Sequence, residues 1–326
     1  MGEFDLIRRY FQRPARRAAL GVGDDCALLA PAPGMQLAIS CDMLVEGRHF
    51  FADVRPRLLG HKALAVNLSD LAASGARPLA FTLAISLPRA DETWIGEFAA
   101  GLLELADQHD CELIGGDTTG GPLNISITVF GEVPSGQALL RSGAQPGDEI
   151  WVSGHLGDAR LALVALQGHI RLPAALLEQA RQRLETPTPR VALGLALRGI
   201  ASSALDVSDG LLGDLGHILE LSRVGATVDS RLALPLMAAA AYPATASWRL
   251  EAELQQQCTL AGGDDYELCF TAPAARHAAV LAAGAASNTP VTCIGRIEAQ
   301  AGLRVIGADG ALLQPHWKSF DHFDAD

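Results

Sequence analysis

Hydrophobic and polar positions along this chain follow two different periods. Stretches in which apolar residues recur every three or four positions predict helices. They cover 3–12, 57–75, 91–109, 158–167, 190–200, 211–223, 250–258 and 274–284. Short apolar or alternating runs bounded by Gly, Pro or Asp predict strands. They cover 26–30, 37–41, 79–87, 111–114, 123–133, 149–153, 204–207, 227–229, 266–271, 291–297 and 303–306. Strands that alternate with helices predict α/β layers.

Two of the predicted helices carry recognisable end signals. Asp91 stands at the start of residues 91–109, where its carboxylate suits an N-cap. Gly75 closes residues 57–75, where glycine suits a C-terminal cap. Asp70 lies in the last two turns of that helix, where a carboxylate opposes the negative end of the helix dipole. The cost is small, and a bound cation would offset it.

Residues 134–148 are rich in turn formers, and we place the domain boundary there. The chain has 326 residues, which is enough for two domains of ordinary size. We therefore expect domains over 1–145 and 146–326. Both halves repeat the order strand, glycine-acid turn, helix, but no sequence repeat is strong enough to show duplication.

Composition limits the class of protein. Hydrophobic residues make up 49% and charged residues 19%, as in a globular protein with a sizeable core. The net charge is −12 and the pI about 5.2, without the basic stripe of a nucleic-acid binder. No apolar run is long enough for a membrane span, and the acidic start lacks the pattern of a signal peptide. Six scattered cysteines without C-x-x-C predict thiols rather than disulfides or zinc, and hence the cytoplasm.

Acidic residues beside glycines recur along the chain, and several follow predicted strands. A single acid, Asp42, comes directly after residues 37–41. Two unit charges about 4 Å apart repel by roughly 4 kcal/mol at an effective dielectric near 20, so carboxylates gathered at strand ends would need cations. Magnesium shares oxygen ligands with phosphates, so the pattern favours phosphoryl transfer. The runs are GVGDD (21–25), GGD (115–117), DVSDG (206–210) and GGDD (262–265).

Each of these features also has an ordinary structural interpretation. A lone Asp after a strand is most often a turn former or a helix cap. Asp24-Asp25 and the GGD run could each be a turn, and Ser208 or Asp209 could cap a helix. Taken singly, His49 is more often structural and Arg141 a surface cation. The functional interpretation depends on all of them occurring in one order.

That order resembles the ThiL-type thiamine-monophosphate kinases, a family of the PurM-like (aminoimidazole-ribonucleotide-synthetase-like) ATP-binding superfamily. NLSDLAASGA with LIGGDTT is highly specific, whereas a lone GGD would mean little. The resemblance covers nearly the whole chain. Its runs are GEF (2–4), GVGDDCALL (21–29), AIS with Asp42 (38–42), KALAVNLSDLAASGA (62–76), LIGGDTT (113–119), RSGA (141–144), DVSDGLLGDLGHI (206–218), GGDDYELCFT (262–271), CIG (293–295) and DHF (321–323).

The resemblance implies an α/β (α+β) fold of two PurM-like domains. The N-terminal domain would hold a mixed sheet with helices, bind ATP and metal, and pair with a second copy in a homodimer. The C-terminal domain would be α/β, with a tail that contacts the substrate.

For the acids, the resemblance implies ligands of several magnesium ions. Asp42 and Asp70 are expected to be the most critical, with Asp70 bridging ions, and no residue is implied as a general base. The family usually has Thr where this chain has Cys41. A thiol is a poor magnesium ligand, so either a backbone carbonyl serves there or the contact is lost. The implied ligands are Asp25, Ser40, Cys41, Asp42, Asp70, Asp117, Asp206 and Asp209.

The resemblance also implies contacts to two substrates, ATP and thiamine monophosphate. Arg141 would meet ATP phosphates, which suits a guanidinium fork. Asp264 matches a substrate contact that is often Glu in relatives, and Trp317 an aromatic contact beside the thiazolium cation. The ATP contacts are Gly116, Asp117, Arg141 and Ser208, and the thiamine monophosphate contacts are His49, Asp264 and Trp317.

The implied reaction is direct transfer of the γ-phosphate in a cleft between the domains, giving thiamine diphosphate and ADP. No P-loop or protein-kinase motif is present in the sequence. Two alternatives stay open. One is an ATP-dependent synthetase of the purine or selenophosphate kind, against which His49 and the aromatic residues of the last ten positions, Trp317, Phe320 and Phe323, argue. The other is a non-catalytic metal- or nucleotide-binding protein, against which the complete ligand set argues.

Overall fold

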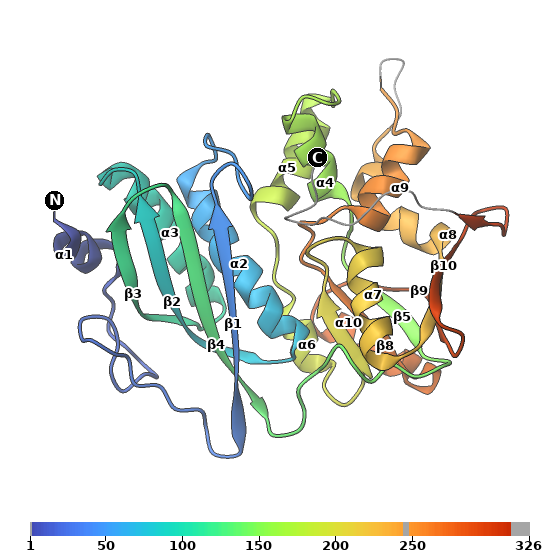
Figure 1. Ribbon diagram of the computed structural model, residues 1–326, viewed down its shortest axis with the longest axis horizontal. Coiled ribbons are helices and arrows are strands. Elements are labelled where there is room, and N and C mark those ends of the chain that lie inside the picture. Colours follow the sequence, from blue (N-terminus) through green and yellow to red (C-terminus); the bar gives the residue numbers. More distant parts are fainter. Residues whose placement is uncertain (1, 244–247, 314–326) are drawn as a thin grey trace. The chain divides into compact units, whose positions relative to one another are not determined.

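The computed structural model describes residues 2–243 and 248–313 and contains two sheets with helices (Figure 1). The chain divides into two compact units. Unit 1 takes the residues up to 71 together with 76–138, and unit 2 takes 72–75 together with the residues from 139 onward. Mixed α/β units with a sheet each confirm the predicted fold class.

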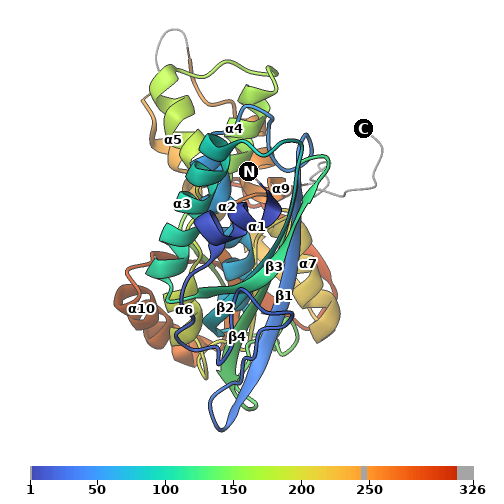
Figure 2. The same ribbon diagram turned by 90° about the vertical axis from the view of Figure 1, so that its left-hand side faces the viewer.

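Unit 1 is a four-stranded mixed sheet with two long helices on one of its faces (Figure 2). The strand order is β1-β4-β2-β3; β4 is antiparallel to both neighbours, and β2 is parallel to β3. The elements are α1 (Glu3–Leu6), the π-helical turn η1 (Ile7–Phe11), β1 (Met35–Val45), α2 (Pro56–Ala73), β2 (Arg77–Leu87), α3 (Glu92–Gln108), β3 (Glu112–Gly120) and β4 (Asn124–Pro134).

The predicted ends of α2 and α3 are confirmed. The Asp91 carboxylate accepts hydrogen bonds from the amides of Thr93 and Trp94, so it is the N-cap of α3. At the end of α2, Gly75 has a φ of +63°. Its amide donates a hydrogen bond to the carbonyl of Ala72, and the amide of Ala76 donates to the carbonyl of Leu71. This pair of hydrogen bonds is the Schellman motif of a helix that ends at glycine.

Three strand predictions in unit 1 need correction. Residues 26–30 form no strand; Leu28 makes one isolated bridge to Leu20 while its neighbours pack on a small apolar cluster. β1 and β3 are longer than predicted, so Asp42 and Asp117 lie inside strands rather than after them. Polar residues and glycine have low strand propensity, but pairing with β4 and β2 carries the strands through them.

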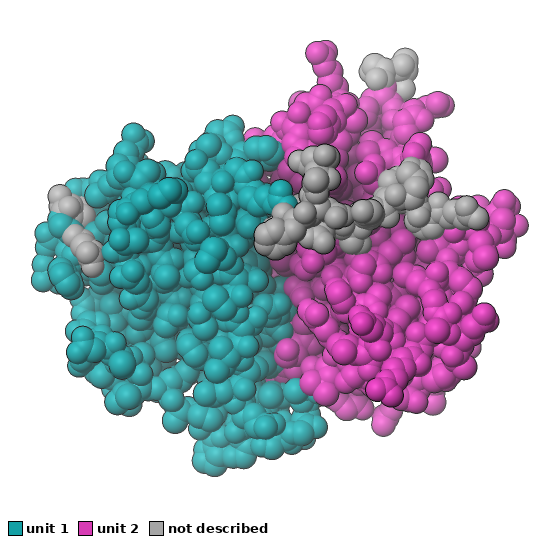
Figure 3. All heavy atoms as spheres, viewed as in Figure 1, with its two compact units in different colours: residues 1–71, 76–138 teal, residues 72–75, 139–326 magenta. Residues whose placement is uncertain are grey.

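Unit 2, drawn in magenta in Figure 3, contains a seven-stranded sheet. Its strand order is β11-β10-β7-β9-β5-β8-β6. Among the strands of unit 2 that the structure describes, β10 and β7 are the only parallel pair. The elements are β5 (Glu149–Ser153), α4 (Asp158–Leu166), α5 (Ala174–Glu185), α6 (Val191–Ala196), β6 (Ser203–Asp206), α7 (Leu211–Ser222), β7 (Gly225–Asp229), α8 (Ser230–Ala233), η2 (Leu234–Leu236), η3 (Ala238–Ala241), α9 (Ala252–Ala261), β8 (Leu268–Ala272), η4 (Ala274–Arg276), α10 (His277–Ala286), β9 (Val291–Glu298), β10 (Gly302–Ile306) and β11 (Leu312–Leu313).

The core of unit 2 contains α7, a helix that was predicted, and α5, a helix that was not. Leu211, Leu215 and Ile218 form the buried stripe of α7, and they join the main core with the inward residues of β5 and β7. Helix α5 was not among the predicted elements, although Leu176, Ala180 and Leu184 lie at helical spacing and pack in a second core cluster. Helix α6 is shorter than the predicted 190–200.

None of the helices in the described part of the chain is long and apolar enough to cross a membrane.

Candidate functional site

In unit 1, the structure brings together Ser40 and Asp42 of β1 with Asp70 of α2. The Ser40 hydroxyl donates a hydrogen bond to the Asp70 carboxylate. The amide of Asp42 donates to Asn67 Oδ1 at 3.1 Å, so α2 also holds the strand beside its acid. Both Asp42 and Asp70 are half-buried. Two carboxylates and a hydroxyl at one helix–strand contact offer hard oxygen donors of the kind that magnesium prefers.

Cys41 differs from its neighbours in the direction of its side chain. Successive side chains of a strand point to opposite faces, so Cys41 lies on the face away from Ser40 and Asp42. Its sulfur is 3.5 Å from the Ser126 hydroxyl of the adjacent strand β4, and the residue is exposed. A ligand from position 41 on the Asp70 side would therefore be its main-chain carbonyl rather than its thiol.

His49, which is predicted to contact the substrate, also makes hydrogen bonds within the protein. Its Nδ1 accepts the amide of Val45 at 2.9 Å, which puts the proton of the neutral ring on Nε2. The buried Lys62 ammonium donates to the carbonyl of His49 at 3.4 Å. These contacts fix the ring close to the end of β1.

The Gly115-Gly116-Asp117 run is part of β3, so its interpretation as a simple turn is wrong. Gly116 has a φ of +142°, and a Cβ there would lie 1.9 Å from the carbonyl oxygen of Leu83. Only glycine fits at this position. Asp117 is exposed and pairs with Ala84 of β2. Asp117, the predicted metal and ATP contact, therefore directly follows a position in β3 where no side chain fits.

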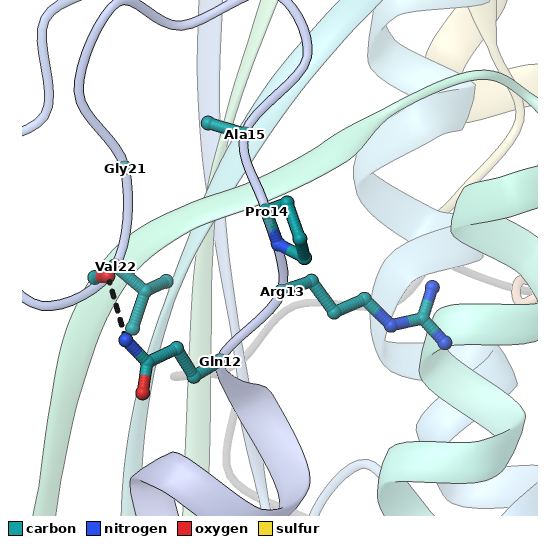
Figure 4. A pocket seen from close by; sticks show the side chains of 6 residues that line it. All are labelled: Gln12, Arg13, Pro14, Ala15, Gly21 and Val22. Atoms are coloured by element: carbon teal, nitrogen blue, oxygen red, sulfur yellow. Dashed lines mark hydrogen bonds between the residues drawn. The ribbon is translucent and has the colours of Figure 1, made fainter.

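Asp24 and Asp25 are exposed. They follow Gly21 and Val22, which line a surface pocket (Figure 4). The pocket has a volume of about 420 Å³ and is lined by residues 12–15, 21 and 22. Gln12 reaches across it to the carbonyl of Val22 at 3.5 Å, whereas Arg13 points away to an ion pair with Asp107 of α3.

Two buried carboxylates fix the ends of the segment that carries Asp25. Glu112 accepts hydrogen bonds from the amides of Arg16, Arg17 and Ala18, at 2.6, 2.7 and 3.0 Å. Glu132 accepts the amide of Ala32 at 2.9 Å. Burial raises the pKa of Glu112, but the three amide hydrogen bonds outweigh it and hold the pKa below its ordinary value.

In unit 2, the DVSDG and GGDD loops run side by side beyond the paired strands β6 and β8. The amide of Asp264 donates to the carbonyl of Ser208 at 2.9 Å, and the amide of Tyr266 donates to the carbonyl of Val207 at 2.9 Å. A Cβ at Gly263 would lie 2.3 Å from the carbonyl oxygen of Ser208, so glycine permits this approach. The predicted ligand Asp209 and the predicted substrate contact Asp264 are therefore on adjacent backbones, with Asp206 at the end of β6.

Two residues in and directly after the GGDD loop have left-handed backbone conformations. Asp264 has a φ of +68° and Tyr266 a φ of +51°. Asp visits this region readily, but for a bulky residue such as Tyr it is unusual and costs roughly 1–2 kcal/mol. Strained backbone of this kind persists only where surrounding contacts enforce it.

Arg141 and Asp214 complete the group in unit 2. The exposed Arg141 precedes amides of Gly143 and Ala144 that donate to the Ser222 hydroxyl. Asp214 accepts the amides of Asp209 and Gly210 at 3.1 and 3.0 Å. Burial raises the pKa of Asp214 to about 6, and the charge of Asp209 acts in the same direction, against the amide hydrogen bonds and the charge of Arg141.

The predicted residues thus fall into two sets within separate units. Among residues 2–243 and 248–313, no three His, Cys, Asp or Glu side chains lie together as a preformed metal site. Trp317 lies outside the described residues. Asp214, Asp265 and Glu267 had no predicted role in the site, although all three lie in the motif runs 206–218 and 262–271. Their burial, which the sequence does not display, is the signal that distinguishes them.

Family models match both halves of the chain. The N-terminal domain of AIR synthase related proteins matches residues 23–133, and the C-terminal domain of the same family matches residues 145–308.

Known proteins resemble the chain over its length. It is 45% identical to the thiamine-monophosphate kinase of Escherichia coli (strain K12), over 99% of this chain and 98% of that protein. The crystal structure of thiamine-monophosphate kinase from Stenotrophomonas maltophilia K279a is 50% identical, with a TM-score of 0.80 over 90% of this chain and 92% of that one. AaThiL complexed with AMPPCP and TMP is 27% identical, with a TM-score of 0.73 over 90% and 89% of the two chains. These matches confirm the resemblance found in the motifs, and the chain belongs to the thiamine-monophosphate kinase family of AIR synthase related proteins.

Proposed function

We propose that this protein transfers the γ-phosphate of ATP to thiamine monophosphate in a magnesium-dependent reaction, giving thiamine diphosphate and ADP. The observation that carries the proposal is identity of 45–50% to thiamine-monophosphate kinases over at least 90% of the chain. A more distant relative has been solved with AMPPCP, an ATP analogue, and TMP together. The proposed step belongs to the biosynthesis of thiamine diphosphate. The similarity to these relatives favours a kinase over the synthetase and non-catalytic alternatives.

The chemistry asks little of a general base. A phosphate oxygen of thiamine monophosphate is already anionic and attacks the γ-phosphorus in line, while the bond to the β–γ bridging oxygen breaks and ADP leaves. Arg141 would bind ATP phosphates through its guanidinium, with Ser208, Gly116 and Asp117 as further contacts. His49, Asp264 and Trp317 would contact thiamine monophosphate. Catalysis then consists of positioning and charge stabilisation.

The donor sets in both units fit magnesium. Carboxylate and hydroxyl oxygens are hard ligands, and the described site residues outside position 41 offer no soft donor. When bound, magnesium would neutralise charge on the phosphate oxygens. Ser40, Asp42 and Asp70 would hold it in unit 1, together with Asp25, Asp117 and the carbonyl of Cys41. Asp206 and Asp209 would hold it in unit 2.

We also propose that the enzyme is a cytoplasmic homodimer that pairs through the sheets of its N-terminal domains. The outward face of β1 supports the pairing, because Leu37, Ile39 and Met43 are 39%, 60% and 54% exposed. Six free cysteines support a reducing compartment. Unit 1 would then bind metal and ATP and form the dimer, and the tail of unit 2 would contact substrate.

The deciding experiment is a product assay. Purified protein is incubated with ATP, magnesium and thiamine monophosphate, and the products are separated by chromatography. We expect thiamine diphosphate and ADP in equal amounts, and neither when EDTA is added or when free thiamine replaces the monophosphate. ADP release that ignores thiamine monophosphate, or that persists without magnesium, would refute the proposal.

A further inference from the structure

The Asp264-Asp265-Tyr266-Glu267 run alternates in burial. Asp264 and Tyr266 are half-buried and left-handed, whereas Asp265 and Glu267 are 1% and 0% exposed. The resemblance gives a role to Asp264 and leaves the two buried carboxylates without one. A buried carboxylate is costly unless it is hydrogen-bonded or paired, so their partners indicate what they hold in place.

Asp265 is bound to the main chain of the loop between β5 and α4. Both of its carboxylate oxygens accept the amide of Gly157, at 3.0 and 2.8 Å. This contact ties the middle of the GGDD loop to the start of α4.

Glu267 is bound by side chains from two helical segments. Its carboxylate accepts hydrogen bonds from Arg183 of α5 at 2.7 Å and from Nε and Nη2 of Arg190, both at 2.6 Å. It also accepts the hydroxyl of Ser153, at the end of β5, at 2.6 Å. Arg183 and Arg190 are themselves mostly buried, so the charge on Glu267 is matched away from water.

We infer that Asp265 and Glu267 are positioning residues, which anchor the loop on both sides of Tyr266 and so force Asp264 into the left-handed conformation beside Ser208. The inference rests on the proposed function, because it assigns the purpose of the anchors to the thiamine monophosphate contact of Asp264. Two anchors, one on each side of the strained Tyr266, supply the enforcing contacts that such a backbone requires.

The test uses Glu267→Gln, with Asp265→Ala as a second variant, because alanine removes the acceptor of the Gly157 amide. The matched control is Glu185→Gln, because Glu185 is also a buried carboxylate paired with an arginine, Arg181, but within α5. Thermal unfolding shows which variants fold. Hydrogen exchange of the peptide covering 262–267 then reports on the amides of Asp264 and Tyr266. We expect exchange to quicken about tenfold in both loop variants and to stay unchanged in Glu185→Gln.

Steady-state kinetics separate positioning from general stability. We expect the KM for thiamine monophosphate to rise about tenfold in Glu267→Gln, while the KM for ATP changes less than about twofold, because Asp214 holds the Ser208–Asp209 turn separately. In the Asp264→Ala background, Glu267→Gln should change kcat/KM less than about twofold, since it acts through Asp264.

Each outcome decides the inference. Unchanged exchange in both loop variants overturns the anchoring. Quickened exchange with an unchanged KM for thiamine monophosphate, or with additive effects in the double variant, overturns the link to Asp264. If the unaltered protein makes no thiamine diphosphate, the proposed function fails, and hydrogen exchange alone still decides whether the anchors hold the loop.

Discussion

At the scale of single residues, carboxylates in this protein have two kinds of surroundings. Asp42, Asp70 and Asp264 are half-buried and lie within reach of solvent ions. Glu112 and Glu267 are buried, and each is surrounded by amide or guanidinium donors. The first kind suits a ligand for cations and phosphates, and the second fixes backbone. Motif membership does not separate these five carboxylates into the two kinds, whereas burial together with the surrounding donors does.

Replacing Asp70 with Asn tests its role as a bridging ligand. The amide keeps an oxygen for the Ser40 hydroxyl, so the fold should be retained, but the loss of charge should lower kcat by about a hundredfold or more. Turnover and thermal unfolding are measured together. Glu104→Gln, which alters the exposed Arg57–Glu104 ion pair of the same unit, should leave both unchanged. Near-normal turnover in Asp70→Asn would contradict the assignment.

The lowered pKa of Glu112 predicts a specific pH dependence of stability. Because the folded pKa lies below the unfolded value near 4.5, ionised Glu112 stabilises the fold above pH 4.5, and this contribution is lost as the pH falls through the folded pKa. In Glu112→Gln, we expect a lower unfolding temperature at pH 7 and a gap to the unaltered protein that narrows below pH 4.5. Exposed Glu97→Gln should show no gap at either pH. A gap that widens in acid would contradict the sign.

At the scale of elements, the existence of a helix or strand was easier to predict from the sequence than the residues at which a strand ends. Helix α3 has both a periodic apolar face and a capping acid, so periodicity and end signals agree. The strands β1 and β3 continue through Asp42 and Gly116, where local propensity is poor and pairing with neighbours decides. Tertiary pairing of this kind cannot be read from one stretch of sequence.

The cap of α3 gives a prediction at this scale. Asp91→Ala removes the acceptor for two amides and should lower the free energy of unfolding of unit 1 by about 1 kcal/mol. Asp91→Ser keeps a capping oxygen and should restore most of it. Chemical denaturation measures both variants. Equal loss in the two would show that the cap is not the cause.

At the scale of the whole molecule, the motif order identified the family and the two-unit architecture, whereas the positions of the acids within strands and the anchors of the loops required the structure. Identification depended on order along the chain, which a sequence displays directly. The contacts of Asp265 and Glu267 join residues more than seventy positions apart, so no local sequence pattern predicts them.

The proposed dimer yields a test of assembly. Ile39→Lys places a charge on the outward face of β1 and should convert the dimer to a monomer, because burying an unpaired ammonium is unfavourable. Light scattering measures the mass, and circular dichroism checks the fold. Leu281→Lys alters an exposed leucine of α10 in unit 2 and should leave the mass unchanged. A monomeric unaltered protein, or a dimeric Ile39→Lys variant, would refute the pairing.

The place of β1 in its sheet has a consequence for synthesis. In the described part of the chain, β1 pairs with β4 alone, and β4 is translated last of the four strands of unit 1. While the ribosome is still adding α3 and β3, the nascent polypeptide contains the eleven-residue strand β1 before its partner strand β4 has been synthesised. Unpaired strands of this kind tend to pair between chains and aggregate. Aggregation should therefore be greatest for polypeptides truncated before Asn124, and in cells with few chaperones.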